Sequence, residues 1–186
     1  MSNPRVEPVD APYSDALRSS FEVVMPRGGT PLNIFRTIGR NPRVLSRMVK
    51  GGLLDRGSIT IAQRELVILR ACAVCGAEYE WGVHVAAFAA KAEFSETQIA
   101  DTCSSTIDKA LWSPEQQSLV TMVDELHSQA TISDGSWARL EQHFAHEQLV
   151  ELLMLAGLYH AVSFVVNGLR ISHEDFAPKF PRNRST

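Results

Sequence analysis

The chain has 186 residues, of which 45% are hydrophobic and 21% are charged. This length and this composition are typical of one globular domain with a single buried core. The formal net charge is -3, so the chain has no excess of basic residues. The composition therefore argues against nucleic-acid binding and against attraction to an anionic membrane surface.

The first residues differ in composition from the rest. Residues 1–28 are rich in Pro, Asp, Ser and Gly, and we expect an extended N-terminal arm there, ahead of one helical domain over residues 29–186. The arm has charged residues but no apolar segment of the signal-peptide type, which predicts a cytoplasmic protein with reduced cysteines. An arm of this kind can pack on a neighbouring subunit.

Helix signals begin at Thr30, which can act as an N-cap before Pro31, and the same pair recurs at Ser113 and Pro114. Apolar residues then repeat at spacings of three and four, and no strand pattern stands out. The predicted helices cover residues 31–38, 42–52, 60–75, 78–91, 95–103, 114–129, 134–143 and 147–169. The sequence therefore predicts an all-α fold, a single-domain bundle of about seven to eight helices.

The last predicted helix is apolar on nearly all sides, so it must be enclosed by the bundle or by another subunit. Glu151 and His160 interrupt its apolar stretch, which favours a buried helix over a membrane span. We expect no membrane contact. Together with the N-terminal arm, this helix indicates a homo-oligomer.

The most informative segment is residues 64–90, RELVILRACAVCGAEYEWGVHVAAFAA. Glu80 and His84 are four residues apart, so on one helix they share a face and can touch. A helix break at Gly76 would fold two helices into a hairpin and bring Glu65 to the same place. The alternative is an exposed surface pair, but the apolar neighbours favour a buried cluster with shifted pKa values.

An acid, a helix break and then Tyr-Glu-Trp-x-x-His at residues 79–84 resemble the carboxymuconolactone decarboxylase-like and alkylhydroperoxidase-D-like superfamily, in a branch that carries YEWxxH. The resemblance extends over residues 33–170 and is most specific in RELVILR…GAEYEWGVH. The segments PLNIFRTIGRNPRVL and ELLMLAGLYHAVSFVVNGLRI support it. The resemblance implies the helical fold of this superfamily and a trimer or hexamer with sites near the subunit contacts.

The resemblance also assigns Glu65 and His84 to a proton relay. In alkylhydroperoxidase-D-like relatives that relay serves a CxxC dithiol, whereas Ala77 and Glu80 occupy the two cysteine positions here. The dithiol of the superfamily is therefore missing from this chain.

The sequence has three cysteines, Cys72, Cys75 and Cys103. Cys75 precedes His84 by nine residues rather than four, and we interpret Cys72 and Cys75 as buried structural thiols. A single CxxC motif supplies too few ligands for a metal. We expect neither a metal nor a cofactor.

The leading prediction is a cofactor-independent acid/base enzyme, a lyase resembling carboxymuconolactone decarboxylase, that acts on a small organic acid, a lactone or an enolisable carbonyl compound. His84 would be the general acid or base, with Glu80 orienting it and Glu65 relaying protons. Further pocket candidates are Tyr79, Trp81, Tyr159, Asn167 and Asn33. The alternatives are an alkylhydroperoxidase or peroxiredoxin-type antioxidant activity of Cys72 and Cys75, and a non-catalytic helical binding module.

Overall fold

The computed structural model describes residues 4–25 and 29–181, which form nine α-helices, one short 3-10 helix and no strand. The all-α prediction is confirmed, with slightly more helices than expected. In chain order the elements are α1 (Asp15–Val24), α2 (Asn33–Ile38), α3 (Pro42–Lys50), α4 (Ile61–Val74), α5 (Glu78–Phe88), α6 (Glu96–Asp101), the 3-10 helix Lys109–Leu111, α7 (Pro114–Gln129), α8 (Asp134–Leu140) and α9 (His146–Leu169). The ends of the predicted arm and domain, residues 1–3, 26–28 and 182–186, lie outside the described residues.

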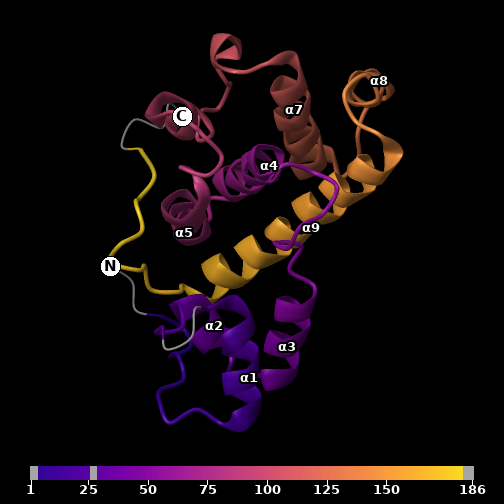
Figure 1. The fold of residues 1–186 in the computed structure, drawn as a ribbon. Helices are drawn as coiled ribbons and strands as arrows, with labels where there is room; N and C mark the ends of the chain where they lie inside the picture. Colours follow the sequence, from indigo (N-terminus) through magenta and orange to yellow (C-terminus); the bar gives the residue numbers. More distant parts are fainter. Residues whose placement is uncertain (1–3, 26–28, 182–186) are drawn as a thin grey trace.

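Helix α4 is the centre of the fold, with α5, α7 and α9 packed around it (Figure 1). It begins at a capping box, in which Thr60 and Gln63 bond each other's backbone N–H groups. Every residue from Arg64 to Ala73 is buried. A helix enclosed in this way is expected to be apolar on all faces, so the charged residues within it need partners inside the protein.

The predicted break at Gly76 is confirmed. Gly76 has a positive φ of 65°, a conformation that glycine adopts without steric cost. Around it the N–H of Ala77 donates to the carbonyl of Cys72 at 2.8 Å, and the N–H of Gly76 donates to the carbonyl of Ala73 at 3.1 Å. This is the Schellman arrangement for ending a helix, and it returns the chain so that α5 packs beside α4.

The prediction of an extended arm is wrong for residues 15–24, which form α1. The Ser14 side chain caps this helix by accepting from the N–H of Leu17. Leu17 and Phe21, one turn apart, are both buried, and α1 packs on α3. This helix has few buried apolar residues. The Pro and Asp residues of the same segment therefore dominated its composition and led to the prediction of an extended arm.

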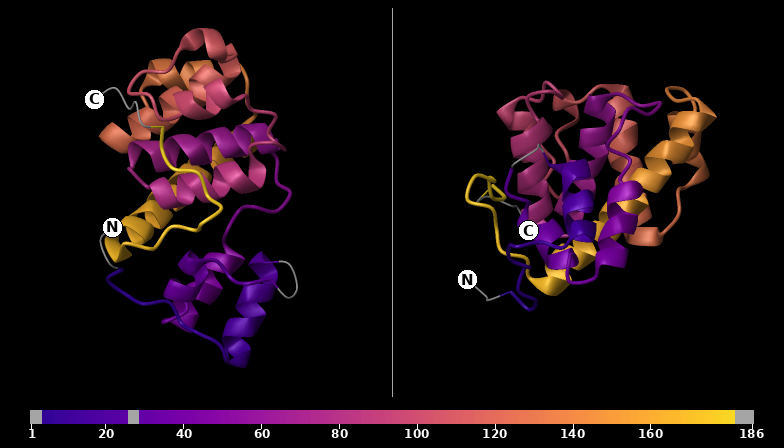
Figure 2. Two further views of the ribbon diagram at one scale, coloured as in Figure 1. Left: turned by 90° about the vertical axis from the view of Figure 1, so that its left-hand side faces the viewer. Right: turned by 60° about the horizontal axis from the view of Figure 1, so that its bottom comes forward.

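The chain ahead of α1 contacts its own α2. The N–H of Val9 donates to the carbonyl of Arg36 at 3.2 Å, and the Arg36 guanidinium donates back to the carbonyl of Val9 at 3.0 Å. Helices α1–α3 thus form a lobe at one end of the body built by α4, α5 and α9 (Figures 1 and 2).

Helix α9 runs along the body and reaches the lobe (Figure 1). Among the described residues it is the one helix long and apolar enough to cross a membrane by length and composition, with a mean hydropathy of 1.9. Its residues Leu152, Leu155 and Tyr159 are nonetheless buried in the protein core. Only 44% of its 18-residue window is buried, and Val150, Met154 and Phe164 are exposed, so the protein's own domain covers one side of α9 and leaves the other side open.

The segment after α9 passes across α5 (Figure 2). The N–H of Phe180 donates to the Glu78 carboxylate at 2.9 Å. Gly82 permits this close approach, because a Cβ atom there would collide with the carbonyl oxygen of Pro178.

Candidate active site

The α4–α5 hairpin and α9 bring one imidazole into contact with two carboxyl groups and a phenol. Nδ1 of His84 lies 2.7 Å from Oε2 of Glu65. Nε2 of His84 lies 3.0 Å from the hydroxyl oxygen of Tyr159 and 3.5 Å from Oε1 of Glu80. All four side chains are buried. Glu65, Glu80 and His84 therefore come together, and Tyr159 joins them.

The second oxygen of Glu65 is held by Arg64, a residue that the sequence analysis missed. Nε of Arg64 donates to Oε1 of Glu65 at 2.8 Å, and its Nη1 donates to the carbonyl of Leu54 at 2.8 Å. The guanidinium also lies over the ring of Phe88, 5.0 Å from its centroid. The sequence did contain a signal for this contact, because Arg64 and Glu65 are adjacent charged residues in an otherwise apolar segment. Charged residues that are buried need a partner of opposite charge.

In these contacts Glu65, rather than Glu80 as the sequence suggested, is the acid that holds the His84 ring. Glu65, fixed through both oxygens, makes the short hydrogen bond that orients the His84 ring. Glu80 stands farther from the ring, and its Oε2 is buried with no hydrogen-bond partner among the described residues. Leaving such an atom unpaired costs about 1–3 kcal/mol, so Glu80 is the acid with a site free for a ligand.

The carboxylates determine the charge of His84. Burial alone would lower the pKa of His84, but the hydrogen bonds to Glu65 and Glu80 outweigh burial and raise the pKa to about 9. At neutral pH the ring is therefore an imidazolium that donates from both nitrogens. Burial raises the pKa of Tyr159 well above its usual value, so its phenol stays protonated.

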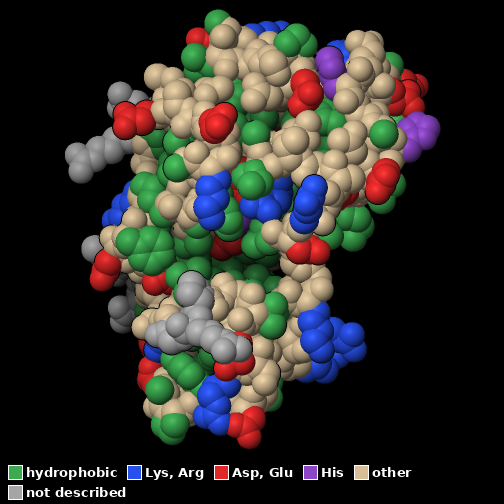
Figure 3. All heavy atoms as spheres, in the orientation of Figure 1, with side chains coloured by type: hydrophobic (Ala, Val, Ile, Leu, Met, Phe, Trp, Pro, Cys, Tyr) green, Lys and Arg blue, Asp and Glu red, His purple; other side chains and the backbone are tan. Residues whose placement is uncertain are grey.

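Glu80, His84 and Tyr159 line a cavity of about 750 Å³ between the α1–α3 lobe and the body. Hydrophobic side chains gather where the surface is hollowed between these two parts (Figure 3). The apolar lining includes Leu32, Phe35, Met48, Val83, Phe88 and Leu158, and Asp55 adds one further carboxyl group. This volume lies within the range of about 300–1,000 Å³ that is usual for small-molecule sites.

The two aromatic pocket candidates on α5 lie away from the cavity lining. The Tyr79 hydroxyl donates to Glu174 at 2.7 Å, and the Trp81 indole N–H donates to the Thr102 hydroxyl at 3.0 Å. Both rings are buried and anchor α5 to neighbouring segments. Their large apolar area and single polar group serve packing.

The two asparagine candidates also lie outside the cavity lining. The Asn33 amide donates to the carbonyl of Ser172 at 3.1 Å, and the Asn167 amide donates to the carbonyl of Cys75 at 2.9 Å. Each amide ties a helix to a chain segment distant in sequence. Of the five pocket candidates only Tyr159 lines the cavity.

The cysteines are absent from the cavity lining within the described chain. None of the three forms a disulfide within the described residues. Cys72 is fully buried, and burial raises its pKa well above the usual value. Cys75 lies at the C-terminal end of α4, where no helix dipole favours a thiolate, and its sulfur lies 3.7 Å from Nδ1 of His127. Neither thiol contacts the His84 ring in the hydrogen bonds of the described residues.

Residues 42–121 match the model of the carboxymuconolactone decarboxylase family. This range contains the whole α4–α5 hairpin with Arg64, Glu65, Glu80 and His84. A comparison with curated proteins gives no match.

Solved structures share the fold over nearly the whole chain. An uncharacterized peroxidase-related protein from Ralstonia eutropha JMP134, described as an alkylhydroperoxidase AhpD core, has a TM-score of 0.76 and 15% identity, covering 96% of this chain and 100% of that one. A peroxidase-related protein from Silicibacter sp. TM1040 has a TM-score of 0.77 and 13% identity, covering 94% and 96%. The debrominase Bmp8 has a TM-score of 0.72 and 14% identity, covering 94% of each chain. At these identities the likeness shows a common fold.

Proposed function

We propose that this chain, which matches the carboxymuconolactone decarboxylase family model over residues 42–121 and shares the fold of alkylhydroperoxidase-D-like structures, is a cofactor-independent acid/base enzyme for a small organic acid, lactone or enolisable carbonyl compound. The observation that carries this proposal is the pairing of a buried imidazolium with a carboxyl group whose second oxygen is unpartnered, on the wall of an apolar cavity. Shifted pKa values in a cavity are typical of catalytic groups.

In the proposed reaction Glu80 is the general base. Its carboxylate accepts a proton from the carbon next to the substrate carbonyl, and the electron pair of the broken C–H bond forms an enolate. The imidazolium of His84 and the hydroxyl of Tyr159 can donate hydrogen bonds to the enolate oxygen. Return of the proton to another carbon gives isomerisation, whereas an enolate formed by loss of carbon dioxide takes up a proton to complete a decarboxylation.

Glu65 and Arg64 are positioning residues in this proposal. Glu65 accepts a hydrogen bond from Nδ1–H of His84. This bond keeps the ring protonated and fixes the direction of its Nε2–H. Arg64 balances the charge of Glu65. Donors that are already fixed in a water-poor site stabilise a developing negative charge without reorganisation.

The first test is hydrogen exchange at carbon in D2O, followed by proton NMR with a panel of small lactones, 2-oxo acids and cyclic ketones. We expect the protein to accelerate exchange next to the carbonyl of at least one class. Glu80→Gln should lower that rate by at least about 100-fold, because an amide cannot accept the proton. Asp55→Asn, on the same cavity wall, is the matched control. Exchange that persists in Glu80→Gln would remove Glu80 from the role of base.

A second candidate function is thiol-dependent hydroperoxide reduction by Cys72 and Cys75, which the descriptions of the related structures favour. Burial raises the pKa of both thiols, and a protonated thiol is a poor nucleophile. We therefore expect a thiol titration to give three groups per chain both before and after treatment with a hydroperoxide. Loss of two thiols, together with peroxide turnover that Cys75→Ser abolishes, would favour the second candidate.

A further inference from the structure

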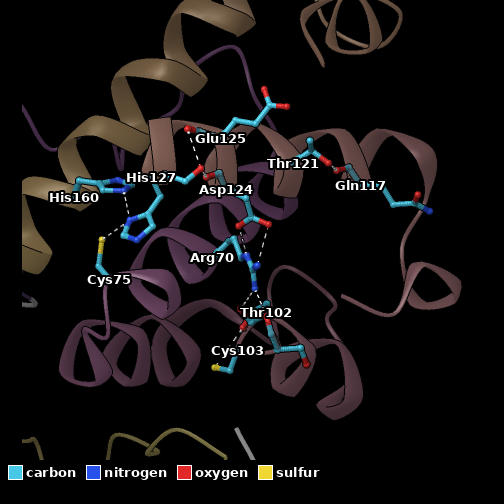
Figure 4. Close-up of polar contacts among 12 residues, drawn as sticks. Arg70, Cys75, Thr102, Cys103, Gln117, Thr121, Asp124, Glu125, His127 and His160 are labelled. Atoms are coloured by element: carbon cyan, nitrogen blue, oxygen red, sulfur yellow. Dashed lines mark hydrogen bonds and ion pairs between the residues drawn. The ribbon is translucent and has the colours of Figure 1, made fainter. Parts of the chain in front are cut away.

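A second group of reactive side chains lies where the C-terminal ends of α4 and α7 meet the middle of α9. It consists of Cys75 after α4, His127 on α7 and His160 on α9, and we call it the Cys-His-His cluster (Figure 4). Nδ1 of His127 lies 3.7 Å from the sulfur of Cys75 and 3.2 Å from Nε2 of His160. All three atoms lie within 4.8 Å of one another.

These separations are close to those of a metal site. In a tetrahedral zinc site, Zn–S bonds of about 2.3 Å and Zn–N bonds of about 2.0–2.1 Å put two nitrogens about 3.3 Å apart and a nitrogen and a sulfur about 3.6 Å apart. The His127–His160 and Cys75–His127 distances in the Cys-His-His cluster are thus already close to those of a zinc site. The third distance, between Cys75 and His160, is at most 4.8 Å, so a side-chain movement of no more than about 1 Å would complete the geometry.

The tautomer of His160 is also the one that a ligand needs. Its Nδ1 lies 2.8 Å from the carbonyl of Ala156, and a carbonyl can only accept, so this nitrogen carries the proton. Nε2 then presents a lone pair towards His127. A histidine that binds a metal through one nitrogen and donates the other N–H to a carbonyl is the usual arrangement in metalloproteins.

We propose that Cys75, His127 and His160 bind one zinc ion and leave the fourth tetrahedral position for water or another ligand. A thiolate with two imidazoles suits zinc, whereas magnesium and calcium prefer oxygen ligands. His127 is exposed and the other two residues are half-buried, so an ion can enter from solvent. His127 and His160 are not among the residues that line the cavity, which makes this a second site.

The surroundings suit a cation. Arg70, whose charge would oppose a metal ion, is paired with both oxygens of Asp124 at 2.6 and 2.9 Å, beside His127 (Figure 4). The amide of Asn167 donates to the carbonyl of Cys75 at 2.9 Å and so fixes the backbone that carries the thiol. An ion here would link α4 to α7 and α9, the two helices that pack most extensively against it.

The test uses the untagged full-length protein, first stripped with a chelator and then titrated with zinc sulfate by calorimetry. We expect one zinc ion per chain and a higher thermal unfolding temperature in its presence, because a ligand that binds only the folded state stabilises it. With Co2+ in place of zinc, a thiolate-to-metal charge-transfer absorption should appear. Titration without saturation, or a stoichiometry well below one, would overturn the proposal.

Variants locate the site. Cys75→Ser, His127→Gln and His160→Gln should each weaken zinc binding by at least about 10-fold, and Cys75→Ser should abolish the cobalt charge-transfer band. His146→Gln is the control, since His146 is an exposed histidine outside the cluster that pairs with Glu141. Because His127 is exposed, a folded His127→Gln protein that binds zinc with unchanged affinity contradicts the proposal. Neither outcome depends on whether the Glu80 site is catalytic.

Discussion

His84→Gln is expected to lower kcat of the proposed reaction by about 100-fold to about 10,000-fold, which is the usual contribution of a positioned acid or base. Glutamine can still donate a hydrogen bond to Glu65, so the local structure should survive. It cannot carry the imidazolium charge that would stabilise an enolate beside Glu80. The measurement is the carbon hydrogen-exchange rate at saturating substrate, with circular dichroism to check the fold.

The pH profile separates a chemical role of His84 from a structural one. Because the pKa of His84 is raised to about 9, kcat/KM of the unaltered protein should fall as the pH rises through about 9, where the ring loses its proton. The His84→Gln variant should lack this fall. His143→Gln, on an exposed position, should behave as the unaltered protein. Full activity in His84→Gln would instead show that the reaction does not need the imidazolium of His84.

Local signals in the sequence predicted most of the helices. The N-cap predicted at Ser113 is present as a capping box, and capping boxes at Thr60 and Ser95 mark the starts of α4 and α6 in the same way. Gly76 predicted the hairpin because few other residues tolerate its backbone conformation. Signals of this kind act within a few residues, so a single sequence is enough to interpret them.

Contacts between distant helices were harder to predict. Glu65 and His84 could be grouped because one turn separates their helices, whereas Tyr159 comes from α9 and touches His84 only through the packing of the bundle. The Cys-His-His cluster was missed for the same reason, since its members are 52 and 33 residues apart in the chain. The prediction that no metal binds considered only side chains near in sequence, whereas the fold brings these three side chains together from distant segments.

The cavity depends on packing in the same way. Its lining combines the α1–α3 lobe with α5 and α9. Part of that lobe, α1, was expected to be an extended arm. The enclosure of Glu80 and His84 therefore could be argued only from their apolar neighbours in sequence, and the size of the cavity could not be predicted at all.

Glu65→Leu is expected to lower the free energy of unfolding by about 3–5 kcal/mol at pH 7, because removing one member of a buried ion pair leaves the other charge uncompensated. The side chain of Glu65 is 1% exposed and that of Arg64 is 9% exposed, so water cannot replace the lost carboxylate. Urea denaturation followed by circular dichroism measures the change. Glu141→Leu, at an exposed position, should change stability by no more than about 0.5 kcal/mol.

Two further measurements identify the cause of this loss. The pKa of His84 is about 9 in the folded protein against an ordinary value of 6.5. Its protonation therefore stabilises the fold fully below about pH 6.5, and this contribution is lost as the pH rises through about 9. The gap between the unaltered protein and Glu65→Leu should narrow over that range. Adding Arg64→Met should restore part of the stability, since apolar replacement of a whole buried pair is often neutral. If the double variant is less stable than Glu65→Leu alone, loss of packing rather than unpaired charge explains the effect.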